Sequence, residues 1–352
     1  MRSVLSTTAP DGIDWKAVDA RGPCLPADAV ARIVRERFAL EGTFAHLAYE
    51  RDDVYRLEAR TGQGCVVRVS RASEPAASLA LQNRALRAIE RVDPSLPVPR
   101  VLASKRGYDV ETVDTVDGQY RLRVLSYVPG FPILRPPRSP ATLASIGSML
   151  ARLDNALCGV PVTDAEFPLL WDVRRAPQLR PFVQYVAHAG RRNLADTVLA
   201  ELEFGGLARL GTLPLQVIHN DFNPKNILFD SVAGPHIVGV IDFGDVVTAP
   251  RVVDLGITIA RHMDSSELMH APRFIIEGYR SVAPLTRNEV DSLYLIVRAR
   301  LAMRAVIGSW RLNQCDGRGD AAQIDDALDL LELLHELGAA EATERWRAQA
   351  GV

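Results

Sequence analysis

The sequence contains very little lysine. Lys16, Lys105 and Lys225 are its three lysines, so arginine supplies nearly all of the positive charge. Lysine and arginine together number 41 against 43 aspartates and glutamates, and the charge is therefore close to balanced. A balanced charge argues against a nucleic-acid-binding surface and against an acidic tail. We expect a small-molecule partner and no nucleic acid.

Cysteines are also few, and their spacing is irregular. Cys24, Cys65, Cys158 and Cys315 form no C-x-x-C pair, which argues against a zinc site and against a disulfide framework. No uncharged apolar run approaches the ~20 residues that a membrane-spanning helix needs. Acidic residues at positions 11 and 14 interrupt the start of the chain before a signal-peptide core can form. We predict a cytoplasmic protein without membrane contact, either monomeric or homodimeric.

The first part of the chain has the pattern of a small sheet with few helices. A length of 352 residues favours two lobes over one core. After a lead-in over residues 1–26, apolar spacing predicts helices at 26–38 and 74–92 and strands at 44–50, 54–59, 65–70, 101–104 and 120–127. Val128-Pro129-Gly130 then breaks the pattern. We therefore place a first lobe at residues 1–127.

The remaining residues, 128–352, are predicted to form a mainly helical second lobe. Helical spacing recurs at residues 141–157, 177–187, 194–204, 265–274, 287–312 and 320–350. Short apolar runs between residues 217 and 241 interrupt it, and these runs are too short for helices.

Two of these short runs predict a hairpin that carries chemistry. Residues 227–229 and 237–241 have strand character, and turn-forming residues separate them. If residue 228 pairs with 240, then Asn226 and Asp242 meet at the open end of the hairpin. An amide oxygen and a carboxylate suit Mg²⁺, which takes its other ligands from phosphate and water. Asp221, just before the hairpin, is then placed to accept a proton from an attacking hydroxyl group.

These residues lie in the stretches V-I-H-N-D-F-N-P-K-N-I-L-F-D and H-I-V-G-V-I-D-F-G-D. Together they resemble the H-x-D-x-x-x-x-N and I-D-x-[GD] signatures of the aminoglycoside phosphotransferase and choline kinase superfamily. The resemblance implies an α+β, bilobal protein-kinase-like fold that binds Mg²⁺ and ATP or GTP. It implies that backbone groups near Leu125 and Tyr127 face the base. It also gives His219 a supporting role in the catalytic loop, and Asp254 a bracing role beneath it.

Within the superfamily, the chain looks similar to the hydroxylysine kinase branch. The similarity lies in L-Q-N-R-A-L at 81–86, L-P-V-P-R-V-L at 96–102, Trp171-Asp172 and the His-Asn-Asp opening of the catalytic loop. This branch implies small amino alcohols or hydroxy amino acids as acceptors.

The sequence departs from the family pattern around the phosphates. Arg68 stands where the family usually has a phosphate-binding lysine, and arginine binds phosphate through a planar fork instead of a point charge. Gln82 stands near the position of the usual glutamate partner, so a contact between Arg68 and Gln82 could replace that ion pair. Arg51 is the one phosphate-compatible residue in the turn after the first strand.

We expect the acceptor to lie against the helical lobe. Polar and aromatic candidates for contacts with it are Trp171, Asp172, Asp245, Glu277, Tyr279 and Arg300.

The sequence is compatible with two other functions. A kinase-like module could bind nucleotide or a small ligand without catalysis, which the missing lysine and glutamate favour. The chain could also be an antibiotic kinase that acts on a macrolide or an aminoglycoside. Aminoglycosides are polycations, whereas the helical segments carry many arginines, which fits an acceptor with a carboxylate better. These arginines are Arg174, Arg175, Arg180, Arg298, Arg300 and Arg304.

Overall fold

The structure is a computed structural model that describes most of the chain. The described residues are 25–49, 52–60, 62, 64–71, 74–115, 118–162, 169–233, 235–313 and 319–352. The predicted lead-in before residue 25 and the candidate phosphate contact Arg51 lie outside them. None of the helices in these ranges is long and apolar enough to span a membrane.

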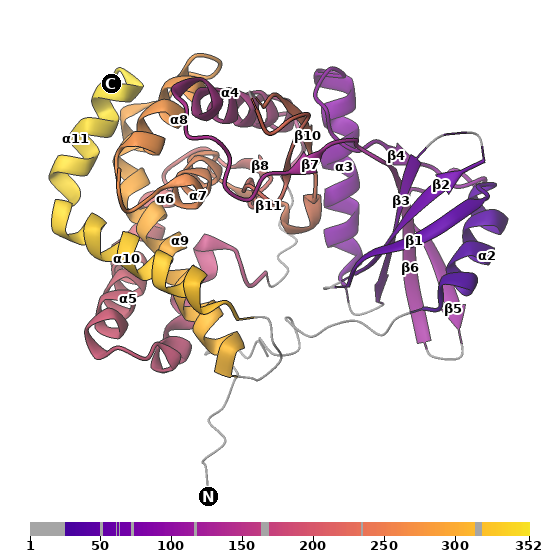
Figure 1. The fold of residues 1–352 in the computed structure, drawn as a ribbon, viewed down its shortest axis with the longest axis horizontal. Coiled ribbons are helices and arrows are strands. Elements are labelled where there is room, and N and C mark those ends of the chain that lie inside the picture. The colour runs from indigo at the N-terminus through magenta and orange to yellow at the C-terminus, as the bar shows by residue number, and fades with distance from the viewer. Residues whose placement is uncertain are drawn as a thin grey trace, which may run out of the picture.

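The N-terminal part is an antiparallel sheet, as predicted (Figure 1). Its strands run in the order β1-β2-β3-β6-β4, and β5 pairs with β6. The bounds are β1 Gly42–Tyr49, β2 Asp53–Ala59, β3 Gly64–Arg71, β4 Val101–Leu102, β5 Glu111–Thr115 and β6 Gly118–Ser126. The sequence did not predict β5, which is short and mixes acidic residues with β-branched ones.

The two faces of this sheet have different roles because side chains alternate along each strand. Helix α2 (Ala27–Phe38) packs its apolar residues on one face, over a core that includes Val67 and Leu122. Helix α3 (Ala76–Val92) lies between the sheet and the helical part (Figure 1). Arg68 and Arg123 alternate with the α2-facing residues, so both point toward α3 and the catalytic segments.

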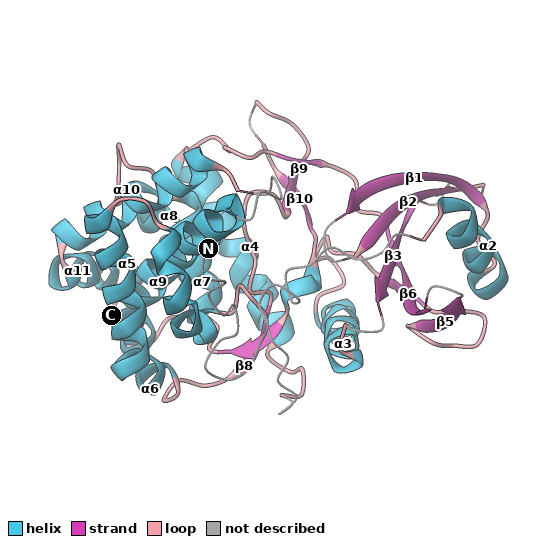
Figure 2. Ribbon diagram, turned by 90° about the horizontal axis from the view of Figure 1, so that it is seen from below, coloured by secondary structure: helices cyan, strands magenta, loops and turns pink. Residues whose placement is uncertain are grey.

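The C-terminal part is mainly helical, with a short three-stranded sheet and a two-stranded sheet near its border with the large sheet (Figure 2). Its strands are β7 Phe131–Pro132, β8 Gln216–Ile218, β9 Ile227–Phe229, β10 Ile237–Val240 and β11 Val247–Ala249. Its α-helices are α4 Pro140–Leu157, α5 Ala189–Glu201, α6 Leu207–Leu210, α7 Val252–His262, α8 His270–Arg280, α9 Arg287–Asn313, α10 Ala321–Leu337 and α11 Ala339–Ala350. The predicted fold class is confirmed, and the boundary predicted after residue 127 stays a prediction.

Several predicted elements differ in detail. The segment from Val173 to Tyr185 is a 3-10 helix, η1, instead of an α-helix, because Pro177 and Pro181 remove backbone donors. A π-helical turn, η2 (Leu202–Gly206), follows α5, and Gly338 divides the predicted last helix into α10 and α11. Its φ of 80° suits glycine best.

Helices α4 and α8 pack at very short distance because each carries a glycine at the contact. A Cβ atom on Gly278 would lie 2.0 Å from the carbonyl oxygen of Ala144, and one on Gly147 would lie 2.0 Å from that of Ile275. Both clashes are with backbone, which cannot move aside as a side chain can. The helices therefore need glycine at both positions.

Gly278→Ala is expected to destabilise the protein by about 1–3 kcal/mol through overpacking, although alanine favours a helix more than glycine does. Urea unfolding measures the free energy. Gly159→Ala is the matched control, since its Cβ atom would meet nothing within 4 Å. Equal stability of the two variants would contradict the close helix contact.

Candidate active site

The catalytic hairpin forms as predicted, but its register is displaced by one residue. Leu228 pairs with Gly239 instead of residue 240, and the register shifts at a bulge between Ile237 and Gly239. The amide of Ile241 donates to the carbonyl oxygen of Asn226 at 2.9 Å. Asn226 and Asp242 therefore still meet at the open end of the hairpin, although they are not directly opposite each other.

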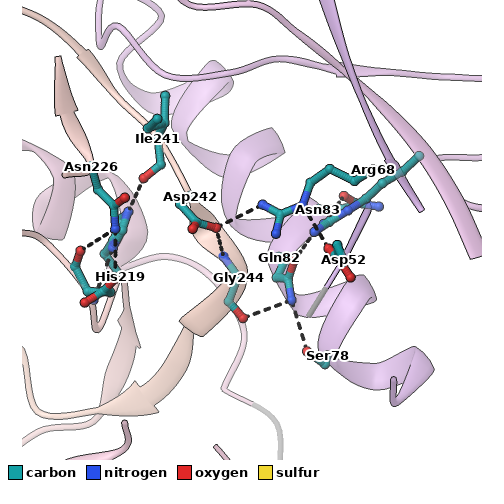
Figure 3. A network of polar contacts seen from close by, with 12 residues as sticks. Asp52, Arg68, Ser78, Gln82, Asn83, His219, Asn226, Ile241, Asp242 and Gly244 are labelled. Atoms are coloured by element: carbon teal, nitrogen blue, oxygen red, sulfur yellow. Dashed lines mark hydrogen bonds and ion pairs between the residues drawn. The ribbon is translucent and has the colours of Figure 1, made fainter. Parts of the chain in front are cut away.

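Asp242 faces the sheet from the end of this hairpin (Figure 3). Its backbone is left-handed, with φ 64°, a conformation that is uncommon outside glycine and typical of functional sites. Its carboxylate accepts hydrogen bonds from Arg68 at 2.9 Å and from the amide of Gly244 at 3.3 Å. Burial opposes ionisation, but the charge and hydrogen bond of Arg68 lower the pKa of Asp242 to about 2. The side chain is 47% exposed, so its carboxylate remains ionised and accessible.

Asp221 is held from two sides. Its Oδ2 accepts a hydrogen bond from the Asn226 side-chain amide at 2.8 Å, and its Oδ1 accepts one from Arg300 at 3.1 Å. Burial raises the pKa of Asp221, and the positive charge of Arg300 opposes that effect. A fixed carboxylate with a raised pKa suits a general base better than an ordinary surface aspartate does.

His219 positions the base and is not accessible to a substrate. The ring is fully buried, and its Nδ1 accepts a hydrogen bond from the amide of Asp221 at 3.2 Å. Its Nε2 lies 3.1 Å from the carbonyl oxygen of Ile241, which assigns the proton to Nε2. Burial lowers the pKa of His219, so the ring is neutral. His219 therefore ties the loop that carries Asp221 to the strand end that carries Asp242.

Asp254 braces the catalytic loop from below, as predicted. Its carboxylate accepts hydrogen bonds from the backbone amides of His219 at 2.7 Å and Asn220 at 2.6 Å. Asn220 has a φ of 65°, a left-handed conformation that glycine adopts most readily. Asparagine tolerates this conformation better than most residues.

Asp154 is a second buried carboxyl group, close enough to Asp254 to be affected by its charge. Tyr279 donates a hydrogen bond to its Oδ2 at 2.6 Å, while its Oδ1 is buried with no hydrogen-bond partner. Burial and the charge of Asp254 raise the pKa of Asp154 well above its ordinary value. Burial therefore favours the protonated form of Asp154.

The raised pKa of Asp154 makes the stability of the folded protein depend on pH. The stabilising contribution of Asp154 is complete below the unfolded pKa of about 3.9 and is lost as the pH rises through the folded pKa. Asp154→Asn does not titrate, so its melting temperature relative to wild type is expected to increase as the pH rises. Thermal unfolding between about pH 4 and pH 9 measures this difference. A difference that stays constant, or that falls with pH, would show that Asp154 is ionised in the folded protein.

Arg68 occupies the place of the usual lysine, but its partners differ from those we predicted. It donates to Asp52 at 2.9 Å as well as to Asp242, and Gln82 is not among its hydrogen-bond partners in the described part of the chain. Gln82 accepts a hydrogen bond from the buried Arg123 and donates to the carbonyl oxygen of Gly244 at 3.2 Å (Figure 3). Helix α3 is thus connected both to the sheet and to the segment after Asp242, without a lysine-glutamate pair.

The predicted base-facing segment lies at the end of β6. The backbone of Leu125 pairs with β3 and β4, and the amide of Tyr127 donates to the carbonyl oxygen of Gly64 at 2.9 Å. The Tyr127 ring lies under the guanidinium of Arg56, 4.3 Å from it. This segment joins the sheet to the helical part, and its contact with a nucleotide stays a prediction.

The predicted acceptor contacts separate into two groups. Trp171 and Arg300 lie together at Asp221: Arg300 donates to the carbonyl oxygen of Trp171 at 2.7 Å and stacks on its ring at 4.8 Å. Tyr279 is fully buried, and Asp172 is almost completely buried and bonded to Arg174, so neither is placed to touch a ligand.

Arg300 was predicted to contact the acceptor, but the structure shows it as a buried partner of Asp221. Only 2% of its side chain is exposed, so it supports Asp221 from the inside instead of presenting a surface to solvent. Asp245, at the end of the short helix η3 (Phe243–Asp245), is partly exposed, and its charge acts on Arg300. The partly exposed Glu277 is paired with Arg273 on α8.

The residues present at the end of the hairpin fit a magnesium ion. The side-chain oxygen of Asn226 accepts no hydrogen bond from any described residue, because its amide nitrogen is the atom that contacts Asp221. Asp242 supplies an ionised and accessible carboxylate beside it. Two hard oxygen ligands with room for phosphate and water are what Mg²⁺ prefers.

A sheet joined to a helical lobe, with Asp221 on the catalytic loop and Asn226 and Asp242 at the open end of the hairpin that follows, defines a small-molecule kinase of the protein-kinase-like fold. The model of the phosphotransferase enzyme family matches residues 47–285. The chain belongs to this family, so the resemblance found in the sequence is confirmed.

Individual relatives agree with this assignment. Hydroxylysine kinase of Xenopus laevis is 26% identical over 271 residues, which cover 71% of this chain and 72% of the relative. Homoserine kinase of Paramagnetospirillum magneticum is 30% identical over 171 residues, 45% of this chain and 51% of the relative. The similarity to the hydroxylysine kinase branch is thereby confirmed.

Solved structures of kinases share the fold. A microcompartment-associated aminopropanol kinase has a TM-score of 0.67 at 19% identity and covers 92% of this chain and 98% of its own. Amicoumacin kinase, in complex with AMP-PNP, Ca²⁺ and Ami, has a TM-score of 0.67 at 14% identity. The match covers 89% of this chain and 94% of the amicoumacin kinase chain.

Proposed function

We propose that the protein transfers the γ-phosphoryl group of ATP or GTP to the hydroxyl group of a small hydroxy amino acid or amino alcohol. The observation that carries this proposal is the hydrogen bond of 2.8 Å from the Asn226 side chain to the Asp221 carboxylate. Asn226 stands at the start of the hairpin that ends in Asp242. A module that only binds a ligand has no physical need for this arrangement.

The roles follow from the contacts. Asp221, oriented by Asn226 and Arg300, accepts the proton of the acceptor hydroxyl group as that oxygen attacks phosphorus. Asn226 and Asp242 would hold Mg²⁺, which when bound neutralises charge on the β- and γ-phosphates. Arg68, already at 2.9 Å from Asp242, is placed to contact phosphate oxygens from the sheet side.

The acceptor class rests on the named relatives and on the charges around the base. Hydroxylysine and homoserine kinases act on molecules that carry a hydroxyl, an amino and a carboxylate group. Asp245, partly exposed beside the base, is a suitable partner for the acceptor's ammonium group. The nucleotide base is proposed to lie against the backbone near Leu125 and Tyr127.

Assays of phosphate transfer to a panel of hydroxy amino acids, amino alcohols, macrolides and aminoglycosides test this function. Each acceptor is offered with ATP and with GTP, with and without Mg²⁺. Magnesium-dependent phosphorylation of a hydroxy amino acid or amino alcohol is the expected result. Turnover only with an antibiotic would move the assignment to an antibiotic kinase, and nucleotide binding without turnover would favour a binding module.

A further inference from the structure

One face of helix α7 runs beneath the catalytic loop. Asp254 contacts the loop amides, and four residues later the hydroxyl group of Thr258 donates to the carbonyl oxygen of Phe222 at 3.2 Å. Arg261 follows three residues after Thr258. Residues at positions i, i+4 and i+7 lie on the same side of a helix, so Arg261 extends this face by one turn beyond the catalytic loop.

Helix α9 brings two more arginines to the same place. Arg300 and Arg304 are one turn apart on α9, and Arg300 contacts the catalytic base Asp221 at 3.1 Å. Arg304 donates to the carbonyl oxygen of Ala260 at 3.1 Å, which places its guanidinium beside the residue that precedes Arg261. The charges of Arg300 and Arg261 both act on Asp221, and Arg304 lies beside Arg261.

Two of the three arginines are paired, and the third is not. Arg300 is engaged by Asp221, and Arg304 by Asp326 at 3.0 Å. No hydrogen bond or ion pair joins the side chain of Arg261 to any other described residue, and its Nε is buried without a partner. Burial and the charge of Arg304 lower the pKa of Arg261 to about 10, so it remains charged. A half-buried guanidinium without an anion is costly unless a ligand supplies one.

We propose that Arg261 binds the carboxylate of the acceptor and thereby selects hydroxy amino acids over amino alcohols. This inference rests on the proposed function. The planar fork of arginine matches a carboxylate with two parallel hydrogen bonds. Arg261 belongs to the helical lobe beneath the base, whereas Arg68 and Asp242 mark the nucleotide side. An anion on Arg261 therefore belongs to the molecule that presents its hydroxyl group to Asp221.

Pairs of acceptors that differ only in the carboxylate provide the test. Homoserine is compared with 3-amino-1-propanol, and 5-hydroxylysine with 1,5-diamino-2-pentanol. Wild type is expected to have a higher kcat/KM for the amino acid of at least one pair. Arg261→Met is expected to lower kcat/KM for the amino acid by roughly 10- to 100-fold, mainly through KM, and to leave the amino alcohol within about twofold.

Controls separate a specific effect from a folding defect. Methionine matches the length of the arginine stem and removes an unpaired charge, so the melting temperature of Arg261→Met should not fall. Arg261→Lys keeps the charge but loses the fork and is expected to recover part of the preference. Arg345→Met, on the exposed side of α11, is the matched arginine control and should behave as wild type.

The outcomes distinguish this inference from the proposed function. Equal kcat/KM values within both pairs, or an equal loss for both members in Arg261→Met, would overturn the carboxylate site while phosphate transfer stands. If no acceptor is phosphorylated, the proposed function fails. Calorimetric titration of wild type and Arg261→Met with homoserine and with 3-amino-1-propanol then tests whether Arg261 binds a carboxylate. Binding that needs both the carboxylate and Arg261 would support the site, and binding without such a preference would exclude it.

Discussion

Asp221→Asn is expected to lower kcat by roughly 10²–10⁴-fold while nucleotide affinity remains within about twofold of wild type. The amide preserves the shape of the side chain but cannot accept the hydroxyl proton. Arg300 is nearly buried, so it loses its anionic partner in this variant, and some loss of stability is also expected. Steady-state kinetics with the best acceptor, together with nucleotide titration, measure both effects.

Asp230→Asn is the matched control for this variant. Asp230 is exposed at the turn of the same hairpin and bonds with His236, away from the catalytic loop. Its replacement should leave kcat close to the wild-type value. Similar kcat values for Asp221→Asn and wild type would remove Asp221 from the role of the base.

Asp242→Ala is expected to abolish magnesium-dependent turnover. The carboxylate has a pKa of about 2, so it is ionised over the whole working pH range and supplies a charged ligand at the open end of the hairpin. Its loss also frees Arg68, which then keeps only Asp52 of its two ion-pair partners. Titration of activity and of nucleotide binding with Mg²⁺ should show no dependence on the metal.

Treatment of wild type with a chelator should reproduce this loss, and added Mg²⁺ should reverse it in wild type but not in Asp242→Ala. Asp114→Ala, at an exposed position of β5, is the control carboxylate. Full magnesium-dependent activity of Asp242→Ala would contradict the proposed metal site.

The sequence predicted the catalytic hairpin because its strands are short apolar runs on either side of a turn. It did not predict the bulge between Ile237 and Gly239, since nothing in the local sequence reports which residues face each other. Helix α7 was missed for another reason. Ten of its eleven residues are buried, and its polar residues Asp254 and Thr258 face the catalytic loop, so the helix lacks the solvent-exposed face of an amphipathic surface helix.

The sequence did not predict which arginines pair with which acidic residues. Arg300 was predicted as an acceptor contact, but it is a buried partner of Asp221, 79 residues earlier in the chain. Several other arginines of the helical segments are paired with nearby acids, such as Arg180 with Asp196 and Arg298 with Glu201. The sequence did not predict Arg261 as a site residue, because only the three-dimensional structure shows that its side chain lacks a partner.

The central claim is that Asp221, Asn226 and Asp242 form a phosphotransferase site. Phosphorus NMR of a hydroxy amino acid incubated with nucleotide, Mg²⁺ and the wild-type protein tests it most directly. We expect a phosphomonoester signal that grows as the γ-phosphate signal disappears, and that is absent with Asp242→Ala. Loss of the γ-phosphate signal without a phosphomonoester, or the same product from Asp242→Ala, would contradict it.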